Sequence, residues 1–264
     1  MIYLFCDFGL PYTAEMRARI AQRAPGLWAE DLLVDAPAHD PRLSSKVLQG
    51  LTRDFPAGSI FVCVIDPGVG GARRPLVVRC DDHWFVGPDN GLFEYPMRAA
   101  QKDMQAWEIV WRPRNLSVTF HGRDLFAPVA GRLAKDISDG GGAMGADHNP
   151  RGVPPTPWGC ATPGEAVDAT GAIRRPDWPD DVFEIVYFDG FGNAFTGVRA
   201  KTLKPGGRLI VNGLSIPFHR TFSDVPESAP LVYENAYGMV EIAVNGGSAK
   251  DRLSLCLGDA VQLI

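Results

Sequence analysis

The stretch FVCVIDPGVGGARRPLVV, residues 61–78, decides the fold class that the sequence predicts. Its apolar first part ends at Ile65, and Asp66-Pro67-Gly68 follows directly. A continuous apolar run of this kind suits a strand that is covered on both faces of a sheet. The glycines after the run permit a tight loop, and Arg73 lies in that loop before the chain turns apolar again. We therefore expect a buried strand that presents a carboxylate at its end.

Strands and helices alternate around this stretch, which predicts an α/β catalytic domain over residues 1–140. We expect an open, largely parallel sheet with flanking helices, followed by a Gly- and Pro-rich linker over 141–180. Short strands and turns after Asp181 predict a smaller all-β, barrel-like domain over 181–264. In the first domain, expected strands occupy residues 2–7, 31–36, 59–65, 75–80 and 83–87, and expected helices occupy 11–24, 41–51 (capped by Asp40) and 122–136.

The bulk composition narrows the class of protein. The chain has 264 residues, a formal net charge of -5 and 45% hydrophobic residues, enough for one large domain or two ordinary ones. The acidic balance argues against nucleic-acid binding, and no apolar run is long enough to cross a membrane. The N-terminus lacks the basic segment of a signal peptide. Five cysteines without a CxxC pair indicate free thiols in a reducing cytoplasm and argue against a zinc site.

Carboxylates recur just after the apolar runs, at Asp7, Asp66, Asp89 and Asp189. Ligands bind at the carboxyl ends of the strands in open α/β sheets, so the repetition indicates a binding site. Asp, Asn, Gly and Pro also form turns after strands anywhere, and that simpler interpretation stays open for each motif alone. The stretch at 61–78 fits neither the dinucleotide GxGxxG fingerprint nor the P-loop pattern.

A second dense motif, HGRD at residues 121–124, stands where we expect a strand to give way to a helix. His121 taken alone could equally be a core histidine or a helix-start residue. A metal site made of Asp66, Asp89, His121 and Asp124 is conceivable. These residues lack the close His and Asp spacings that metallohydrolases show, which argues against it.

Six motifs in a fixed order give the chain a specific resemblance that spans nearly its whole length. They are DFG at 7–9, VIDPGVGGARR at 64–74, FVGPDNGL at 85–92, TFHGRDLFAPVA at 119–130, FGN at 191–193 and NAYGMVEIAVNGGSA at 235–249. Together they resemble the S-adenosyl-L-methionine hydroxide adenosyltransferases, relatives of the fluorinase and chlorinase enzymes. The resemblance implies an α/β domain, a β-barrel-like domain, and a homotrimer with active sites between subunits. The implied reaction is hydrolysis of S-adenosyl-L-methionine to adenosine and L-methionine.

The resemblance also implies roles for individual residues. By motif position, the family's catalytic Asp, Arg and His fall on Asp66, Arg73 and His121. Asp7 matches the carboxylate that holds the ribose hydroxyls. The remaining substrate-binding positions, most of them around the adenine, are Phe120, Phe191, Asn193, Phe222, Asn235, Val244 and Gly246.

The chemistry of the reaction is compatible with these residues. The sulfonium leaves readily, but water is a weak nucleophile with a pKa of about 15.7, so the site must orient it and stabilise developing hydroxide. Arg73 and His121 can supply positive field or hydrogen bonds, and either Asp66 or His121 can take the proton. Neither a metal nor a redox cofactor is needed for this displacement.

Two departures from the family pattern concern the methionine end of the substrate. The loop at residues 10–13 is about two residues short and lacks the usual acidic residue, and Ala236 replaces a common serine. Three other functions stay open: a halogenating or other C5′-displacement enzyme, a non-catalytic S-adenosyl-L-methionine or nucleoside binding protein, and a metal-dependent hydrolase. The halogenating relatives carry other residues at the positions of Asp66 and His121, which favours water as the nucleophile.

Overall fold

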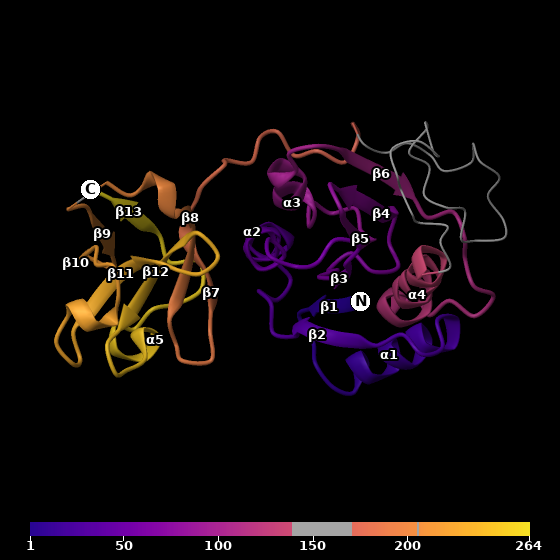
Figure 1. Ribbon diagram of the computed structural model, residues 1–264, viewed down its shortest axis with the longest axis horizontal. Helices are drawn as coiled ribbons and strands as arrows, with labels where there is room; N and C mark the ends of the chain where they lie inside the picture. Colours follow the sequence, from indigo (N-terminus) through magenta and orange to yellow (C-terminus); the bar gives the residue numbers. More distant parts are fainter. Residues whose placement is uncertain (139–170, 205) are drawn as a thin grey trace. The chain divides into compact units, whose positions relative to one another are not determined.

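The computed structural model of the protein describes residues 1–138, 171–204 and 206–264. The chain divides into two compact units, whose elements are labelled in Figure 1. The α/β unit comprises Met1–Ser45 and Phe55–Arg175, and the β unit comprises Lys46–Asp54 and Pro176–Ile264. Most of the predicted linker at 141–180 lies outside the described residues.

The α/β unit is built on a six-stranded sheet with the order β2-β1-β3-β5-β4-β6. The pairs β1–β2, β1–β3 and β3–β5 are parallel, whereas β4 pairs antiparallel with both β5 and β6. The sheet is therefore mixed: β4 alone runs against the other five strands, so most of the sheet is parallel, as predicted. The local cause of the reversal is the two-residue connection Asp81-Asp82 between β4 and β5, because such a tight turn joins antiparallel strands. The strands are β1 (Ile2–Cys6), β2 (Ala29–Leu33), β3 (Ile60–Val64), β4 (Pro75–Cys80), β5 (His83–Pro88) and β6 (Met104–Glu108).

Helices were predicted at 11–24, 41–51 and 122–136, and the structure has a helix in each of these places, whereas the short helix at Glu94–Ala99 was not predicted. The helices of the first half are α1 (Tyr12–Arg23), α2 (Pro41–Leu51), α3 (Glu94–Ala99) and α4 (Ala127–Asp136). The backbone N–H of Leu43 donates to Oδ1 of Asp40 at 2.9 Å, so Asp40 caps α2 as predicted. The expected helix at 122–136 differs in its first turn, which is the π-helix η1 (Gly122–Phe126). Single π-turns are frequent at functional sites, and His121 immediately precedes this one.

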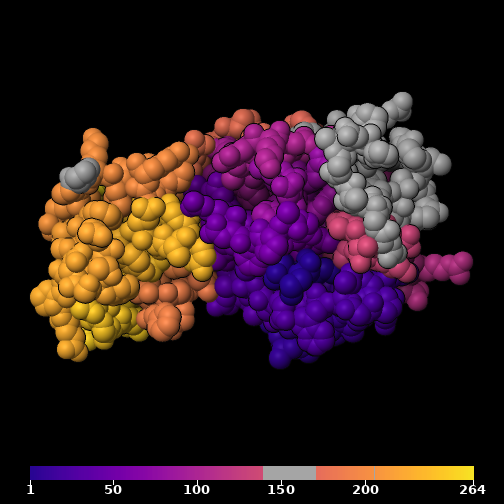
Figure 2. All heavy atoms as spheres, in the orientation of Figure 1, coloured from indigo at the N-terminus to yellow at the C-terminus, as the bar shows by residue number. Residues whose placement is uncertain are grey.

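The continuous apolar run of β3 is explained by burial on both of its faces. All five residues of the strand are buried. Val62 and Val64 belong to a core cluster that also contains Phe126 and Leu133, from η1 and α4. On the other face Phe61 stacks on Phe85 with ring centroids 5.2 Å apart. In Figure 2 the indigo N-terminal segment packs against the purple segments of the same unit.

The β unit holds two antiparallel sheets, with the orders β10-β9-β13 and β11-β12-β8-β7. Single bridges, Glu184–Ala260 and Phe218–Val232, join edges of the two sheets. The sequence did not predict β8, whose apolar pattern Gly197 interrupts, yet a Cβ at Gly197 would lie 2.5 Å from Cβ of Val182. The elements are β7 (Val182–Phe188), β8 (Ala194–Arg199), β9 (Arg208–Val211), β10 (Leu214–Pro217), η4 (Phe222–Asp224), β11 (Pro230–Glu234), β12 (Met239–Val244), α5 (Ala249–Arg252) and β13 (Val261–Leu263).

The sequence also predicted free thiols and no segment that crosses a membrane. Cys6, Cys63, Cys80 and Cys256 are free thiols, and Cys160 lies outside the described residues. Burial raises the pKa of the Cys6 and Cys63 thiols, so these two side chains behave as apolar core groups. Every helix within the described ranges is too short or too polar to span a membrane.

Candidate active site

The three predicted catalytic residues meet just beyond the carboxyl end of β3 in the α/β unit. Nε of Arg73 donates to Oδ1 of Asp66 at 3.0 Å and lies 3.1 Å from its Oδ2. Nη2 of Arg73 also contacts Oδ2 of Asp66 and lies 2.7 Å from Nδ1 of His121. The side chains of Arg73 and Asp66 are only 10% and 4% exposed. One guanidinium therefore links the carboxylate to the imidazole in a largely buried cluster, which we call the Arg73 cluster.

The loop after β3 explains how Arg73 returns to Asp66 seven residues later. Two successive turns form it, in which the N–H of Val69 donates to the backbone carbonyl of Asp66 and the N–H of Gly71 donates to the backbone carbonyl of Gly68. Gly70 has a φ of 78°, and a Cβ on it would lie 2.5 Å from the carbonyl oxygen of Val118. A side chain at Gly70 would be both strained and in collision, so the glycine is required for this path.

The contact between Arg73 and His121 determines the tautomer and the protonation of the imidazole ring. A guanidinium only donates hydrogen bonds, so Nδ1 of His121 accepts and the proton of the neutral ring is on Nε2. Burial lowers the pKa of His121, and the nearby Arg73 guanidinium lowers it further. His121 is therefore a neutral hydrogen-bond donor at neutral pH, and Nε2–H is the group through which it can donate to a ligand oxygen.

Asp7 and Phe120 lie next to this cluster in the fold. Asp7 follows β1, whose last residue Cys6 pairs with Val64 of β3, so Asp7 and Asp66 leave neighbouring parallel strands at the same sheet edge. The backbone N–H of His39 donates to Oδ2 of Asp7 at 3.1 Å. The ring of Phe120, directly before His121, lies edge-on to the rings of Phe8 and Tyr12, 5.8 and 5.4 Å between centroids. An aromatic wall that the sequence did not predict thus borders the polar cluster.

The four residues of the conceivable metal site do not form one group of ligands, since Asp66 and His121 contact Arg73 whereas the other two pair with different arginines. Asp89 accepts hydrogen bonds from Arg74 at 2.6 and 2.9 Å, and Asp124 accepts from Arg123 at 2.7 and 2.9 Å. Each of these carboxylates is thus engaged by its own arginine. Among residues 1–138, 171–204 and 206–264, no three His, Cys, Asp or Glu side chains are grouped as ligands for a metal ion.

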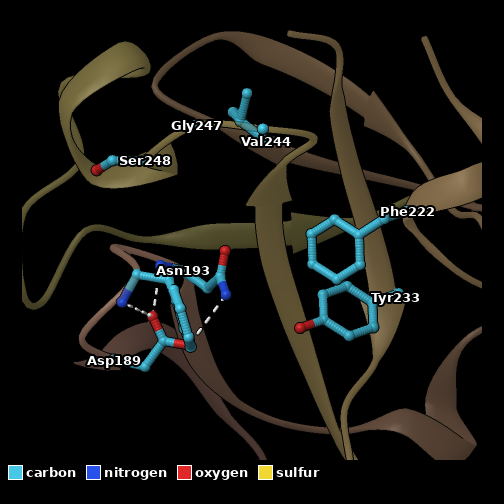
Figure 3. Close-up of a pocket in the computed structure, with 9 residues that line it drawn as sticks. Asp189, Asn193, Phe222, Tyr233, Val244, Gly247 and Ser248 are labelled. Carbon is cyan, nitrogen blue, oxygen red and sulfur yellow. Dashed lines mark hydrogen bonds between the residues drawn. The ribbon is translucent and has the colours of Figure 1, made fainter. Parts of the chain in front are cut away.

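The β unit contains a cavity of about 690 Å³ that gathers most of the predicted adenine-binding residues (Figure 3). The rings of Phe222 and Tyr233 lie on one side of it, 5.2 Å between centroids, and Asp189 and Asn193 lie across from them. Phe191 is 81% exposed, so its ring is open to solvent beside the cavity. Predicted lining residues are Phe191, Asn193, Phe222, Val244 and Gly246. Asp189, singled out in the sequence only as a carboxylate after an apolar run, also lines the cavity, and the lining residues that the sequence missed are Tyr233, Gly247 and Ser248.

Asn235 lies apart from the other predicted residues, in the wall of a smaller cavity of about 410 Å³ that Ala236 also lines. Its Nδ2 donates to Oε2 of Glu241 at 2.8 Å, and the hydroxyl of Tyr233 donates to Oε1 of the same carboxyl. Glu241 is buried on β12, and burial raises its pKa. A charged residue inside the apolar run MVEIAV was the sequence signal that could have revealed this network.

Two domains of one protein family match the two parts of the chain. Residues 2–139 match the SAM hydroxide adenosyltransferase N-terminal domain, and residues 183–262 match the C-terminal domain of the same family. The crystal structure of an uncharacterized conserved protein from Thermotoga maritima superposes with a TM-score of 0.78 at 28% identity, covering 100% of this chain and 99% of that one. The fold is thus that of a known two-domain class, an α/β unit followed by antiparallel β-sheets.

Proteins of similar sequence over their whole length show the family to which the chain belongs. An (R)-S-adenosyl-L-methionine hydrolase from Thermus thermophilus is 37% identical, covering 100% of this chain and 99% of that protein. A hydrolase of the same name from Salinispora arenicola is 34% identical over 97% of this chain and 95% of its own. A fluorinase from Actinoplanes sp. is 22% identical over 88% and 86%. The chain belongs to the SAM hydroxide adenosyltransferase family.

Proposed function

We propose that this protein hydrolyses S-adenosyl-L-methionine to adenosine and L-methionine by attack of an activated water at C5′. The observation that carries the proposal is the Arg73 cluster, which places a cation and a neutral imidazole donor at the end of a buried strand. A cavity of about 690 Å³ with aromatic walls is of a size for a nucleoside. The full-length relatives named as (R)-S-adenosyl-L-methionine hydrolases support the same reaction.

The members of the Arg73 cluster take distinct roles in this proposal. Nε2–H of His121 donates to the attacking oxygen, and the guanidinium of Arg73 stabilises its developing negative charge. Nδ1 of His121 already accepts from Arg73 and Nε2 carries a proton, so the acceptor that remains in the cluster is the carboxylate of Asp66. As the O–C5′ bond forms, the C5′–S bond breaks, the sulfonium leaves as the neutral thioether of methionine, and the water proton passes to Asp66.

The substrate-binding roles also remain part of the proposal. Asp7 accepts from the ribose hydroxyls, which is a charge-assisted contact. Phe120 borders the reacting end, while Phe191 and Phe222 pack on the adenine. Asn193, Asn235, Val244 and Gly246 complete the adenine and methionine subsites. The reaction needs no cofactor and no metal, so added chelator should leave turnover unchanged.

Four further properties, which concern the β unit, the oligomeric state, the location and the partners, belong to the same proposal. The two sheets of the β unit form a barrel-like domain, which the bridges Glu184–Ala260 and Phe218–Val232 support. The protein is a cytoplasmic homotrimer with active sites at subunit interfaces and binds neither nucleic acid nor membrane. Resemblance to the family supports the trimer, and a monomeric mass in solution would count against it. Free buried thiols support a reducing compartment.

A product assay tests the proposed function. The purified protein is incubated with S-adenosyl-L-methionine, with and without chloride, and the products are separated by chromatography. We expect adenosine and methionine in equal amounts, independent of chloride, and loss of turnover in Asp66→Ala. A chloride-dependent chlorinated nucleoside would instead identify a halogenating enzyme. Intact S-adenosyl-L-methionine that binds without turnover would identify a binding protein.

A further inference from the structure

The loop between β7 and β8, residues 189–193, forms one wall of the cavity in the β unit (Figure 3). Asp189 organises this loop, since its Oδ1 accepts the backbone N–H groups of Phe191 and Asn193, both at 2.9 Å. Its Oδ2 accepts from Nδ2 of Asn193, also at 2.9 Å. The N–H of Lys250 in α5 anchors the loop further by donating to the carbonyl of Gly192 at 2.9 Å. The loop therefore holds the Asn193 amide in one place.

The carboxylate of Asp189 also decides which end of that amide faces the cavity. Both of its oxygens already accept from N–H donors, so only the nitrogen end of Asn193 can face them. The amide oxygen then points away from Asp189, as Figure 3 shows. Within the described residues no donor reaches this oxygen, although Asn193 is only 7% exposed. The amide oxygen of Asn193 is therefore a fixed acceptor that is open to the cavity and available to a ligand.

We propose that Asp189 sets the base preference of this site by fixing the orientation of the Asn193 amide; the inference rests on the proposed function. An asparagine amide reads adenine by accepting from the 6-amino group and donating to N7. In the orientation that Asp189 imposes, Oδ1 accepts from the amino group and the second hydrogen of Nδ2 is left for N7. A 6-oxo purine would place its oxygen against Oδ1, acceptor against acceptor. Asp189 is thus a positioning residue that favours 6-amino purine nucleosides.

The substitution Asp189→Asn should reverse this preference. The introduced amide must keep its oxygen on the backbone N–H groups of Phe191 and Asn193, which turns its nitrogen toward the Asn193 side chain. Amide nitrogens only donate hydrogen bonds, so two of them that face each other cannot pair. The amide of Asn193 therefore rotates and presents its oxygen to the nitrogen of the introduced amide. Its own NH₂ group then faces the cavity, where it suits the 6-oxo oxygen of inosine.

The experiment measures the affinities of adenosine, inosine and purine riboside for the full-length protein by titration calorimetry. The wild type should bind adenosine more tightly than inosine by roughly 5- to 150-fold, the discrimination expected of one bidentate amide contact. Purine riboside, which lacks a 6-substituent, should fall between them. The ratio should drop to one or below in Asp189→Asn. In Asp189→Ser the hydroxyl can still accept a loop N–H, but the amide of Asn193 is released, so the ratio should approach one.

A matched control is available in the same unit. Oδ2 of Asp259 accepts from Nδ2 of Asn212 at 2.8 Å and from the N–H of Cys256 at 2.9 Å, the same kind of carboxylate–amide pair away from the cavity lining. Asp259→Asn should therefore leave the ratio of adenosine to inosine affinity at the wild-type value. Thermal unfolding of each variant verifies that it is folded. Turnover of S-adenosyl-L-methionine by Asp189→Asn should fall mainly through KM, since Asp189 does not touch the reacting atoms.

The outcomes separate this inference from the proposed function. A wild type that hydrolyses S-adenosyl-L-methionine but binds adenosine and inosine equally overturns the inference, and this comparison needs no variant. Folded Asp189 variants that keep the full wild-type ratio also overturn it, because the amide orientation would then not depend on Asp189. A wild type that neither binds adenosine nor consumes S-adenosyl-L-methionine means instead that the proposed function is wrong.

Discussion

At the scale of single residues, Arg73 joins two partners that lysine could not hold together. Its planar guanidinium contacts Asp66 and, from the same Nη2, donates to Nδ1 of His121. Lysine is a compact point charge on a flexible stem and does not reproduce this fork. We expect Arg73→Lys to lower kcat by about 10²–10³-fold, the loss typical of one transition-state donor. Adenosine affinity should change far less.

Steady-state kinetics and calorimetry on the same Arg73→Lys preparation measure the two quantities. Equal losses in kcat/KM and in adenosine affinity, with kcat unchanged, would assign Arg73 to ligand binding.

The neutral state of His121 predicts the acid side of the pH–rate profile. Burial and the Arg73 guanidinium lower its pKa below the ordinary value of 6.5, so the Nδ1 acceptor survives mild acidification. The kcat should therefore stay level as the pH falls to 6.5 and should decline only below it. The free energy of unfolding should also fall on the acid side, because the unfolded chain binds the His121 proton more tightly than the folded chain. This stability is lost as the pH falls from 6.5 through the folded pKa.

Turnover followed from pH 5 to 8 checks this expectation. A decline that begins well above pH 6.5 would mean that protonated His121 is not the inactive form.

The residues of the candidate site were predictable from the sequence where they lie in a recognisable motif. Asp66, Arg73 and His121 come from three motif positions, and the structure brings their side chains together. The tautomer of His121 was not predictable, because it depends on which nitrogen meets Arg73. Asp189 was visible only as another carboxylate after a strand, and its hydrogen bonds to Asn193 require the folded loop.

At the scale of elements, β12 carries the buried carboxyl of Glu241 between Tyr233 and Asn235. Burial raises its pKa above the ordinary 4.5, so the folded protein binds this proton more tightly than the unfolded chain. The contribution of Glu241 to stability is therefore present below pH 4.5 and is lost as the pH rises through the folded pKa. The glutamine in Glu241→Gln does not titrate. As the pH rises from about 4.5 to 7, the free energy of unfolding of this variant should therefore increase relative to that of the wild type.

Urea unfolding of both proteins at several pH values tests the prediction for Glu241. A difference in unfolding free energy that stays constant over this range would contradict the assignment. Glu241→Leu serves as a second variant, and it should destabilise the protein at every pH. It leaves the Tyr233 hydroxyl and the Asn235 amide without their acceptor, at about 1–3 kcal/mol for each unsatisfied group.

Element types were predictable where one local signal dominates. The buried strand β3 and the Asp40 cap of α2 follow from an apolar run and a cap residue, and both are confirmed. The antiparallel direction of β4 was missed because pattern alone does not distinguish a hairpin from a crossover. The π-turn of η1 was missed because GRDLF has an ordinary helical composition. Strand β8 was missed because Gly197 serves close packing, which the sequence does not display.

At the scale of the whole molecule, composition and alternation predicted an α/β part over 1–140 followed by an all-β part over 181–264. The chain divides into two compact units, but Lys46–Asp54, from the predicted α/β part, belongs to the β unit, so the predicted bounds stay a prediction. The linker over 141–180 stays a prediction, since most of it lies outside the described residues. Subunit number was not readable from one chain, because composition and periodicity do not encode which surfaces meet. The homotrimer therefore stays a proposal that rests on resemblance to the family.

The most direct test of the central claim is to follow the oxygen atom. The protein is incubated with S-adenosyl-L-methionine in water enriched in the heavy stable isotope of oxygen, and both products are analysed by mass spectrometry. If water attacks C5′ at the Arg73 cluster, the label enters the 5′-hydroxyl of adenosine and methionine stays unlabelled. Labelled homoserine with methylthioadenosine, or adenosine without label, would contradict attack of water at C5′.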